Sequence, residues 1–215
     1  MGGLAEKQIG DSVDALKSHD VALAQRIISL DDKIDMFQRE IEEKAIDIIA
    51  RRQPMAIDLR DVVGALRVAN DLERIGDLAK NNAKRVAALD NDIQLTKVMR
   101  GFEHMANLAL SQIKDVLDSY ARRDVESALA VWRGDEEIDG VNNSLFRELL
   151  TYMMEDPRNI GLCIHLLFCA KNIERIGDHT TNIAETVYYI VKGKPLPDER
   201  PKGDTTAAVS VAFPS

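Results

Sequence analysis

The sequence has 215 residues, of which 30% are charged and 5% aromatic, and its formal net charge is −8. A chain of this length forms one large domain or two of about 100 residues, either able to bury a core. The low aromatic content favours a helical protein over a β-sandwich or barrel. The acidic balance argues against nucleic-acid binding, which needs a basic face. It is compatible with cation binding or with a solvated acidic surface.

The two cysteines, Cys163 and Cys169, lie six residues apart in one apolar run, a spacing that suits neither a redox motif nor a disulfide. We interpret them as buried thiols of a cytoplasmic protein. The sequence shows no signal peptide and no uncharged apolar run of about 18 residues. We therefore expect a soluble protein that does not insert into a membrane.

Apolar residues recur at helical spacing along most of the chain. Six segments are predicted to be helices: residues 4–17, 21–52, 55–89, 93–121, 125–155 and 158–192. Asp20 and Asp124 are predicted N-caps, while Pro54 and Pro157 mark the breaks before the third and sixth helices. The second helix is expected to bury one face, formed by Ile27, Leu30, Ile34, Phe37, Ile41 and Ile48.

The sequence contains an internal repeat. Asp71-Leu-Glu-Arg-Ile-Gly-Asp-Leu-Ala-Lys-Asn81 returns 101 residues later as Asn172-Ile-Glu-Arg-Ile-Gly-Asp-His-Thr-Thr-Asn182. At an offset of 104, two further sets match: Met1, Leu4, Ala5, Gln8, Ile9 and Asp11 with Met105, Leu108, Ala109, Gln112, Ile113 and Asp115, and 31–35 with 135–139. Three matched helices predict a duplicated unit.

We therefore predict an all-α protein of two tandem three-helix bundles related by an internal pseudo-twofold repeat. The predicted division is a first bundle over residues 1–90, a second over 91–192 and a flexible tail over 193–215. Helix-forming residues precede Met105 but have no counterpart before Met1. The first helix is thus expected to be truncated and shorter than its partner.

Acidic residues recur four apart at repeat-equivalent positions. Glu73, Asp77 and Asn81 form one oxygen-bearing stripe on a helix, and Glu174, Asp178 and Asn182 form the second. The preceding helix of each half adds a pair: Asp31 with Asp35, and Asp135 with Asp139. Carboxylates spaced i, i+4 on a helix repel each other by about 0.2–0.5 kcal/mol per pair.

A bound cation would relieve this repulsion. Oxygen-only ligands on adjacent helices suit hard cations such as Mg²⁺, Mn²⁺, Ca²⁺ or ferric iron. The alternative is a solvated charged surface with ordinary ion pairs, in which Arg74, Arg175 and Lys80 neutralise the acids. Gly76 and Gly177 lie between the two acids of each stripe, where a side chain would crowd either a neighbouring helix or a ligand.

With these motifs, the chain resembles the PhoU family of accessory proteins of bacterial phosphate-specific transport. The resemblance covers residues 1–192 and includes the opening Gly-x-Leu-Ala-Glu-x-Gln, the Asp-x-x-x-Asp pairs and both Glu-Arg-Ile-Gly-Asp-x-x-x-Asn stripes. It implies metal clusters on the bundle surface, of iron, manganese, magnesium or another metal. The implied ligands are Asp31, Asp35, Glu73, Asp77, Asp135, Asp139, Glu174 and Asp178, with Asn81 and Asn182 as auxiliary positions.

The resemblance also implies a non-enzymatic function. Such a protein would restrain phosphate uptake and phosphate-starvation signalling, as an adaptor between the phosphate ABC transporter and a sensor histidine kinase at the cytoplasmic membrane face. A homodimer is expected. The alternative is a metal-dependent all-α hydrolase, such as a nucleotide pyrophosphatase, in which acidic residues hold Mg²⁺. The separation of the acids into two stripes favours the adaptor.

Overall fold

The computed structural model describes residues 1–89 and 96–197, and every regular element in those ranges is helical. In chain order the elements are α1 (Gly2–Ser18), α2 (Val21–Arg52), α3 (Ile57–Val86), α4 (Thr96–Arg122), α5 (Val125–Arg133), α6 (Asp135–Glu155), the short 3₁₀ helix η1 (Pro157–Asn159) and α7 (Ile160–Lys192). The all-α prediction is confirmed, and none of these helices is long and apolar enough to cross a membrane.

The predicted helix ends follow from local chemistry. The Asp20 carboxylate accepts a hydrogen bond from the Leu23 N–H at 2.8 Å, and the Asp124 carboxylate accepts from the N–H groups of Glu126 and Ser127. Both satisfy donors that a helix start leaves unpaired, so both predicted N-caps are confirmed. The expected start of the fourth helix at residue 93 and most of the predicted tail lie outside the described residues.

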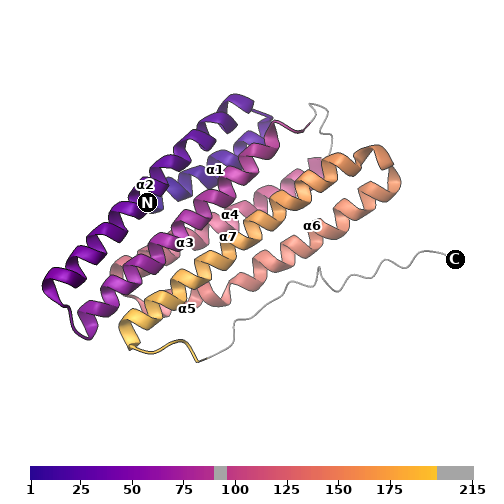
Figure 1. Cartoon of the computed structure of the whole chain (residues 1–215). Coiled ribbons are helices and arrows are strands. Elements are labelled where there is room, and N and C mark those ends of the chain that lie inside the picture. Colours follow the sequence, from indigo (N-terminus) through magenta and orange to yellow (C-terminus); the bar gives the residue numbers. More distant parts are fainter. Residues whose placement is uncertain (90–95, 198–215) are drawn as a thin grey trace.

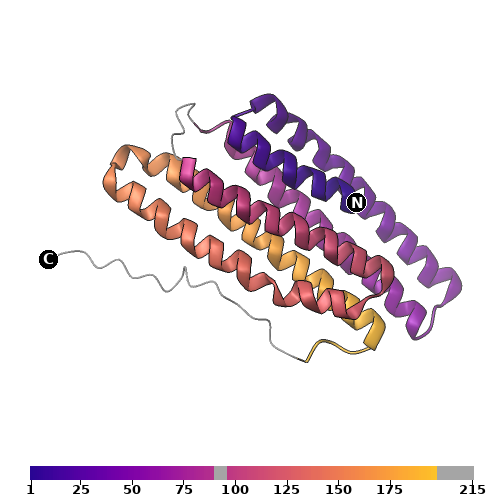
Figure 2. The same ribbon diagram turned by 180° about the vertical axis from the view of Figure 1, so that it is seen from behind.

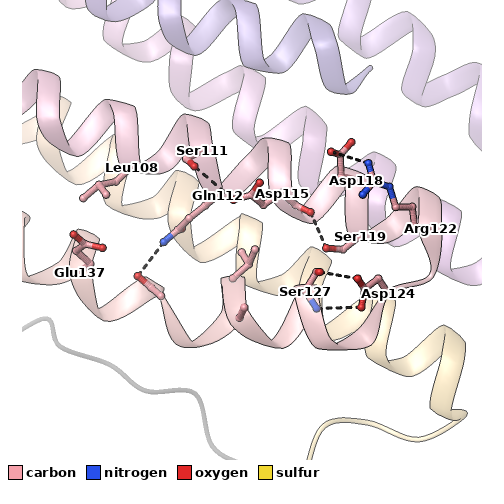
Figure 3. A pocket seen from close by; sticks show the side chains of 13 residues that line it. Leu108, Ser111, Gln112, Asp115, Asp118, Ser119, Arg122, Asp124, Ser127 and Glu137 are labelled. Carbon is pink, nitrogen blue, oxygen red and sulfur yellow. Dashed lines mark hydrogen bonds and ion pairs between the residues drawn. The ribbon is translucent and has the colours of Figure 1, made fainter.

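The predicted helix over residues 125–155 is wrong as a single helix, because Gly134 separates α5 from α6. The Gly134 carbonyl accepts from the Glu137 N–H and from the Gln112 side chain, at 3.2 and 3.0 Å. The bond from Glu137 spans three residues, so this turn has a 3₁₀ pattern. The Gln112 side chain of α4 donates a second hydrogen bond to the same carbonyl (Figure 3). The first half has Leu30 at this position, inside a continuous α2.

The two halves lie side by side, with α3 and α7 antiparallel at the centre (Figure 1). Figure 2 shows α1 and α4 together on the opposite face of this central pair. In each half the second long helix packs on the outer side, α2 against α3 and α6 against α7. The α2–α3 and α6–α7 turns therefore lie at opposite ends of the molecule, as a pseudo-twofold arrangement of two three-helix bundles requires.

The core is made by the apolar stripes that the periodicity predicts. Ile34 of α2 and Ile75 of α3 are fully buried, as are their counterparts Ile138 and Ile176, and Ile27 of α2 is fully buried as well. Cys163 and Cys169 are also buried and free, so the prediction of two buried thiols is confirmed.

The expected burial of Ile48 is wrong, because this side chain is 40% exposed. The helix α1 has 17 residues and spans about 25 Å, whereas α2 has 32 residues and spans about 48 Å. The first helix is thus too short to cover the end of α2. It is also shorter than α4, which has 27 residues, as predicted.

Candidate metal-binding clusters

The first group of predicted ligands lies where α2 packs against α3. Asp31 and Asp35 come from α2, and Glu73 and Asp77 come from α3; we call these four carboxylates the first cluster. The Lys80 ammonium donates to Asp31 and, at 2.6 Å, to Asp77 Oδ1. One side chain from α3 therefore bridges the two helices within the first cluster.

Burial and mutual repulsion both disfavour charge in the first cluster. Burial raises the pKa of Asp31, which is 4% exposed, and the charges of Asp77 and Asp35 raise it further against the opposing effect of Lys80. Burial is also the main cause of the raised pKa of Glu73, followed by the charge of Asp77. The carboxylates therefore interact with one another, and a nearby positive charge stabilises them.

Basic side chains supply part of that charge, as the charged-surface alternative predicts. Burial lowers the pKa of Lys80, but its hydrogen bonds to Asp31 and Asp77 outweigh this effect and raise it. The Nε atom of Arg74 lies 3.4 Å from Glu73 Oε2, and its Nη1 atom lies 3.7 Å from Asp77 Oδ2. Glu73 Oε2 is nevertheless buried and accepts no hydrogen bond.

The second cluster has the same composition at the contact of α6 with α7: Asp135, Asp139, Glu174 and Asp178. Glu174 is 6% exposed, and burial raises its pKa, as do the charges of Asp178 and Asp139. The Lys171 ammonium lies 2.9 Å from Glu174 Oε1 and acts in the opposite direction. Glu174 Oε2, like its counterpart Glu73 Oε2, is buried without a hydrogen bond.

The halves use different lysines beside equivalent acids. Lys80 aligns with Thr181, whose hydroxyl donates to the Asp178 backbone carbonyl at 2.8 Å. Lys171 in turn aligns with Asn70. The sequence identifies Lys80 as a partner of Asp77, but its bond to Asp31 depends on the packing of α2 against α3 and was not predicted. The Lys171–Glu174 pair is spaced i, i+3 within α7, so helical spacing was an available signal that the sequence analysis did not use.

Gly76 and Gly177 keep the cluster helices close together. A Cβ on Gly76 would lie 2.9 Å from Ile34 Cδ1 and 3.0 Å from Gln8 Oε1, and a Cβ on Gly177 would lie 2.9 Å from Asp135 Oδ1. The sequence left open whether a side chain at these glycines would crowd a neighbouring helix or a ligand, and the structure places side-chain atoms of neighbouring helices there. Because these glycines have no side chain, Gln8 of α1 and Ile34 of α2 can approach the α3 backbone, and Asp135 of α6 can approach the α7 backbone.

Gln8 and Gln112 are repeat-equivalent neighbours of the clusters that sequence reasoning missed. Gln8 is buried with neither amide atom hydrogen-bonded, and the Gln112 oxygen is likewise buried without a partner. The internal repeat matches Gln8 with Gln112, and this match was the sequence signal that could have drawn attention to them. Their spacing on α1 and α4 gives no indication of where their amides point.

The two auxiliary asparagines, Asn81 and Asn182, have different environments. Asn81 is exposed, whereas Asn182 donates to Asp71 Oδ1 at 3.3 Å across the contact of α3 with α7. His179 Nδ1 lies 2.9 Å from the same Asp71 oxygen. At the pseudo-equivalent place, Asn172 donates to Asn82 at 2.8 Å. The first residue of each signature copy, Asp71 or Asn172, thus joins the two halves.

The chemistry of both clusters fits a hard cation. Each combines four carboxylates from two helices, and each holds a buried glutamate oxygen without a hydrogen bond. The present rotamers do not form a finished site: within residues 1–89 and 96–197, no three His, Cys, Asp or Glu side chains are placed so that they could hold a metal ion. Metal binding in the first cluster would require Lys80 to move away from Asp31 and Asp77.

These features define an all-α repeat protein in which each three-helix unit carries four carboxylates between its second and third helices. The family model described as the PhoU domain matches residues 1–86 and again residues 102–187. The chain therefore belongs to the PhoU family.

Similar proteins are known from several bacteria. The chain is 60% identical to a phosphate-specific transport system accessory protein PhoU homolog of Rhizobium meliloti, over 97% of this chain and 88% of the relative. It is 50% identical to the homolog of Caulobacter vibrioides, over 95% and 89%.

Two crystal structures share the fold. PhoU from Pseudomonas aeruginosa has a TM-score of 0.86 at 41% identity, covering 90% of this chain and 93% of that one. The phosphate transport system regulatory protein PhoU from Streptococcus pneumoniae has a TM-score of 0.84 at 28% identity, covering 91% of each chain. These proteins are named as accessory or regulatory proteins rather than as enzymes.

Proposed function

We propose that this chain is an accessory protein of phosphate-specific transport that restrains phosphate uptake and phosphate-starvation signalling. The observation that supports this most is the 60% identity, across 97% of the chain, to an accessory protein of the phosphate-specific transport system. In this proposal the chain acts at the cytoplasmic membrane face, as an adaptor between the phosphate ABC transporter and a sensor histidine kinase. The homodimer expected from the resemblance stays a prediction.

The proposal includes metal binding at the two clusters. Asp31, Asp35, Glu73 and Asp77 would hold a hard cation in one half, and Asp135, Asp139, Glu174 and Asp178 in the other. Bound there, the cation would neutralise the carboxylates and join two helices. The support is the pair of buried, unbonded oxygens on Glu73 and Glu174. Iron, manganese and magnesium all suit such ligands, because carboxylates discriminate weakly among hard cations.

This proposal assigns the chain a regulatory role without catalysis. The paired clusters lie in separate halves, each against its own α3 or α7, and the two signature copies contact each other through Asp71, His179 and Asn182. This arrangement suits a protein that links binding partners. The names of the relatives favour the adaptor over the hydrolase alternative.

The experiment is deletion of the gene in its host, with a phosphatase reporter of phosphate starvation read in phosphate-rich medium. We expect the reporter to be switched on by the deletion and silenced again by the wild-type gene. A second complementing gene carries Glu73→Gln with Asp77→Asn, and a matched control carries Glu42→Gln with Glu43→Gln at exposed positions of α2.

The control gene should silence the reporter, whereas the cluster variant should leave it on. A reporter that stays silent after deletion would overturn the regulatory proposal. If the deletion activates the reporter but the cluster variant complements fully, regulation does not need the first cluster.

A further inference from the structure

Gln8 is a buried polar side chain that makes no hydrogen bond. It lies in the middle of α1 with 1% of its surface exposed, and neither its amide nitrogen nor its amide oxygen has a hydrogen-bond partner. Buried polar side chains in folded proteins nearly always have a partner. An amide with both ends unbonded therefore calls for a ligand at that place.

The position of the Gln8 oxygen identifies where such a ligand would lie. The point that a Gly76 Cβ would occupy is 3.0 Å from Gln8 Oε1 and 3.7 Å from Asp31 Oδ1. Gln8 from α1 and Asp31 from α2 therefore present oxygens to the same stretch of α3, which carries Glu73 and Asp77 on either side of Gly76. Ile34 Cδ1 also lies 2.9 Å from that point, so the missing glycine side chain lets these three side chains come close to the α3 backbone beside the first cluster.

The second half shows what the equivalent amide does when it has a partner. Gln112 donates through its nitrogen to the Gly134 carbonyl at 3.0 Å (Figure 3). In the first half that carbonyl belongs to Leu30, which lies inside the continuous helix α2, so the helix uses it. Gln8 thus lacks the backbone acceptor that fixes Gln112, and its amide oxygen lies beside Gly76 near Asp31 Oδ1.

We infer that Gln8 is a further ligand of the first cluster, supplying a neutral amide oxygen to the cation that Asp31, Glu73 and Asp77 hold. This inference rests on the proposed metal binding. Asn and Gln carbonyl oxygens are ordinary ligands of hard cations beside carboxylates. An amide oxygen adds a ligand without adding another negative charge to four carboxylates that repel one another. The site then draws on all three helices of the first half.

The test is Mn²⁺ titration of the whole protein, with free Mn²⁺ read by electron paramagnetic resonance. The parent carries Glu174→Gln and Asp178→Asn, so that only the first cluster reports. In this parent, Gln8→Met keeps an unbranched side chain but removes the amide, and we expect it to weaken Mn²⁺ binding by about tenfold or more. Gln8→Glu keeps an oxygen and adds charge, so it should bind Mn²⁺ more tightly than the parent.

Metal-free stability gives an independent readout. Gln8→Met should raise the melting temperature without metal, because it removes an unbonded buried amide, and Gln8→Glu should lower it, because it adds a fifth carboxylate. Gln25→Met, at an exposed position of α2, is the matched control and should change neither quantity.

The outcomes separate this inference from the proposed metal binding. A parent that binds Mn²⁺ while Gln8→Met binds equally well overturns the role of Gln8 and leaves the cluster as a metal site. A lower metal-free melting temperature for Gln8→Met with unchanged Mn²⁺ affinity identifies a purely structural amide and likewise overturns its role as a ligand. If Gln8→Met fails to fold, binding by Gln8→Glu no tighter than by the parent overturns the inference. A parent that binds no Mn²⁺ overturns both proposals.

Discussion

Lys80 neutralises two carboxylates of the first cluster that are also proposed to bind a metal ion. Its ammonium binds Asp31, which is almost fully buried, and Asp77 at the same time. A buried carboxylate that loses its counter-charge destabilises the folded state, whereas a cation in the same place restores the balance. Lys80 and a metal ion would therefore compete for the same oxygens.

Replacing Lys80 should expose this competition. Lys80→Met is expected to lower the free energy of unfolding of metal-free protein by about 2 kcal/mol, because it leaves buried acceptors unpaired. Mn²⁺ should restore more stability to this variant than to the wild type. Lys84→Met, one turn further along α3 at an exposed position, is the control. Urea unfolding with and without Mn²⁺ measures both effects, and equal Mn²⁺ responses in the two variants would contradict the competition.

The cluster glycine of the second half can be tested against another helical glycine. A Cβ on Gly177 would lie 2.9 Å from Asp135 Oδ1, whereas a Cβ on Gly140 of α6 would meet nothing within 4 Å. Gly140→Ala should therefore stabilise the protein by about 0.5–1 kcal/mol through helix propensity. Gly177→Ala should lower stability and weaken Mn²⁺ binding, because Asp135 must move. A Gly177→Ala variant as stable as Gly140→Ala would show that this close approach is not needed.

At the scale of the elements, the start of α5 depends on a charged cap. The Ser127 hydroxyl donates to the Asp124 carboxylate at 2.7 Å, and backbone N–H groups of Ser127 and Glu126 also donate to it. These bonds, led by that of the hydroxyl, hold the pKa of Asp124 below its ordinary value of 3.8. A carboxylate with a lowered pKa in the folded state stabilises that state above the ordinary value.

This gives a pH dependence of definite sign. The stabilisation by ionised Asp124 is fully present above pH 3.8 and is lost as the pH falls through the lower folded pKa. The melting temperature of the wild type should therefore exceed that of Asp124→Asn at neutral pH, and the difference should shrink below pH 3.8. Calorimetry at several pH values measures this difference. A gap that widens on acidification would contradict the role of the charged cap.

The elements also show how far the sequence could predict the structure. Helical periodicity, N-cap residues and the repeat were enough for the helices, their ends at Asp20 and Asp124, and the pairing of carboxylates between helices. They were not enough for the break at Gly134, because the Gln112 side chain that binds its carbonyl comes from α4, 22 residues earlier. Contacts between distant segments leave no periodic trace in the sequence.

The same limit applies to the candidate site. The eight carboxylates could be named from spacing, since i, i+4 positions share a helix face. The orientation of Gln8 toward Gly76 and the reach of Lys80 to Asp31 follow from how α1, α2 and α3 pack, so neither could be predicted.

For the whole molecule, the contact of α3 with α7 joins the two halves. These helices pack along their lengths, and Asp71, His179 and Asn182 add hydrogen bonds between them. The division into bundles over residues 1–90 and 91–192 stays a prediction. The extent of the α3–α7 contact indicates that neither half keeps its buried surface without the other.

Thermal unfolding should accordingly follow a single cooperative transition. Ile34→Ala in the first half and Ile138→Ala in the second remove equivalent buried side chains, and each should cost about 2–5 kcal/mol. Both should lower the temperature of the same transition in calorimetry. Two transitions, each sensitive to only one of these substitutions, would show that the halves fold separately.

The central claim is that repeat-equivalent carboxylates on α2–α3 and α6–α7 bind metal ions. The direct measurement is the metal content of protein purified from its host, by elemental analysis. Glu73→Gln with Asp77→Asn should remove the metal of the first cluster, Glu174→Gln with Asp178→Asn that of the second, and the combined variant should retain none. Glu42→Gln with Glu43→Gln should leave the content unchanged. The same metal content in all four variants as in the wild type would contradict the claim.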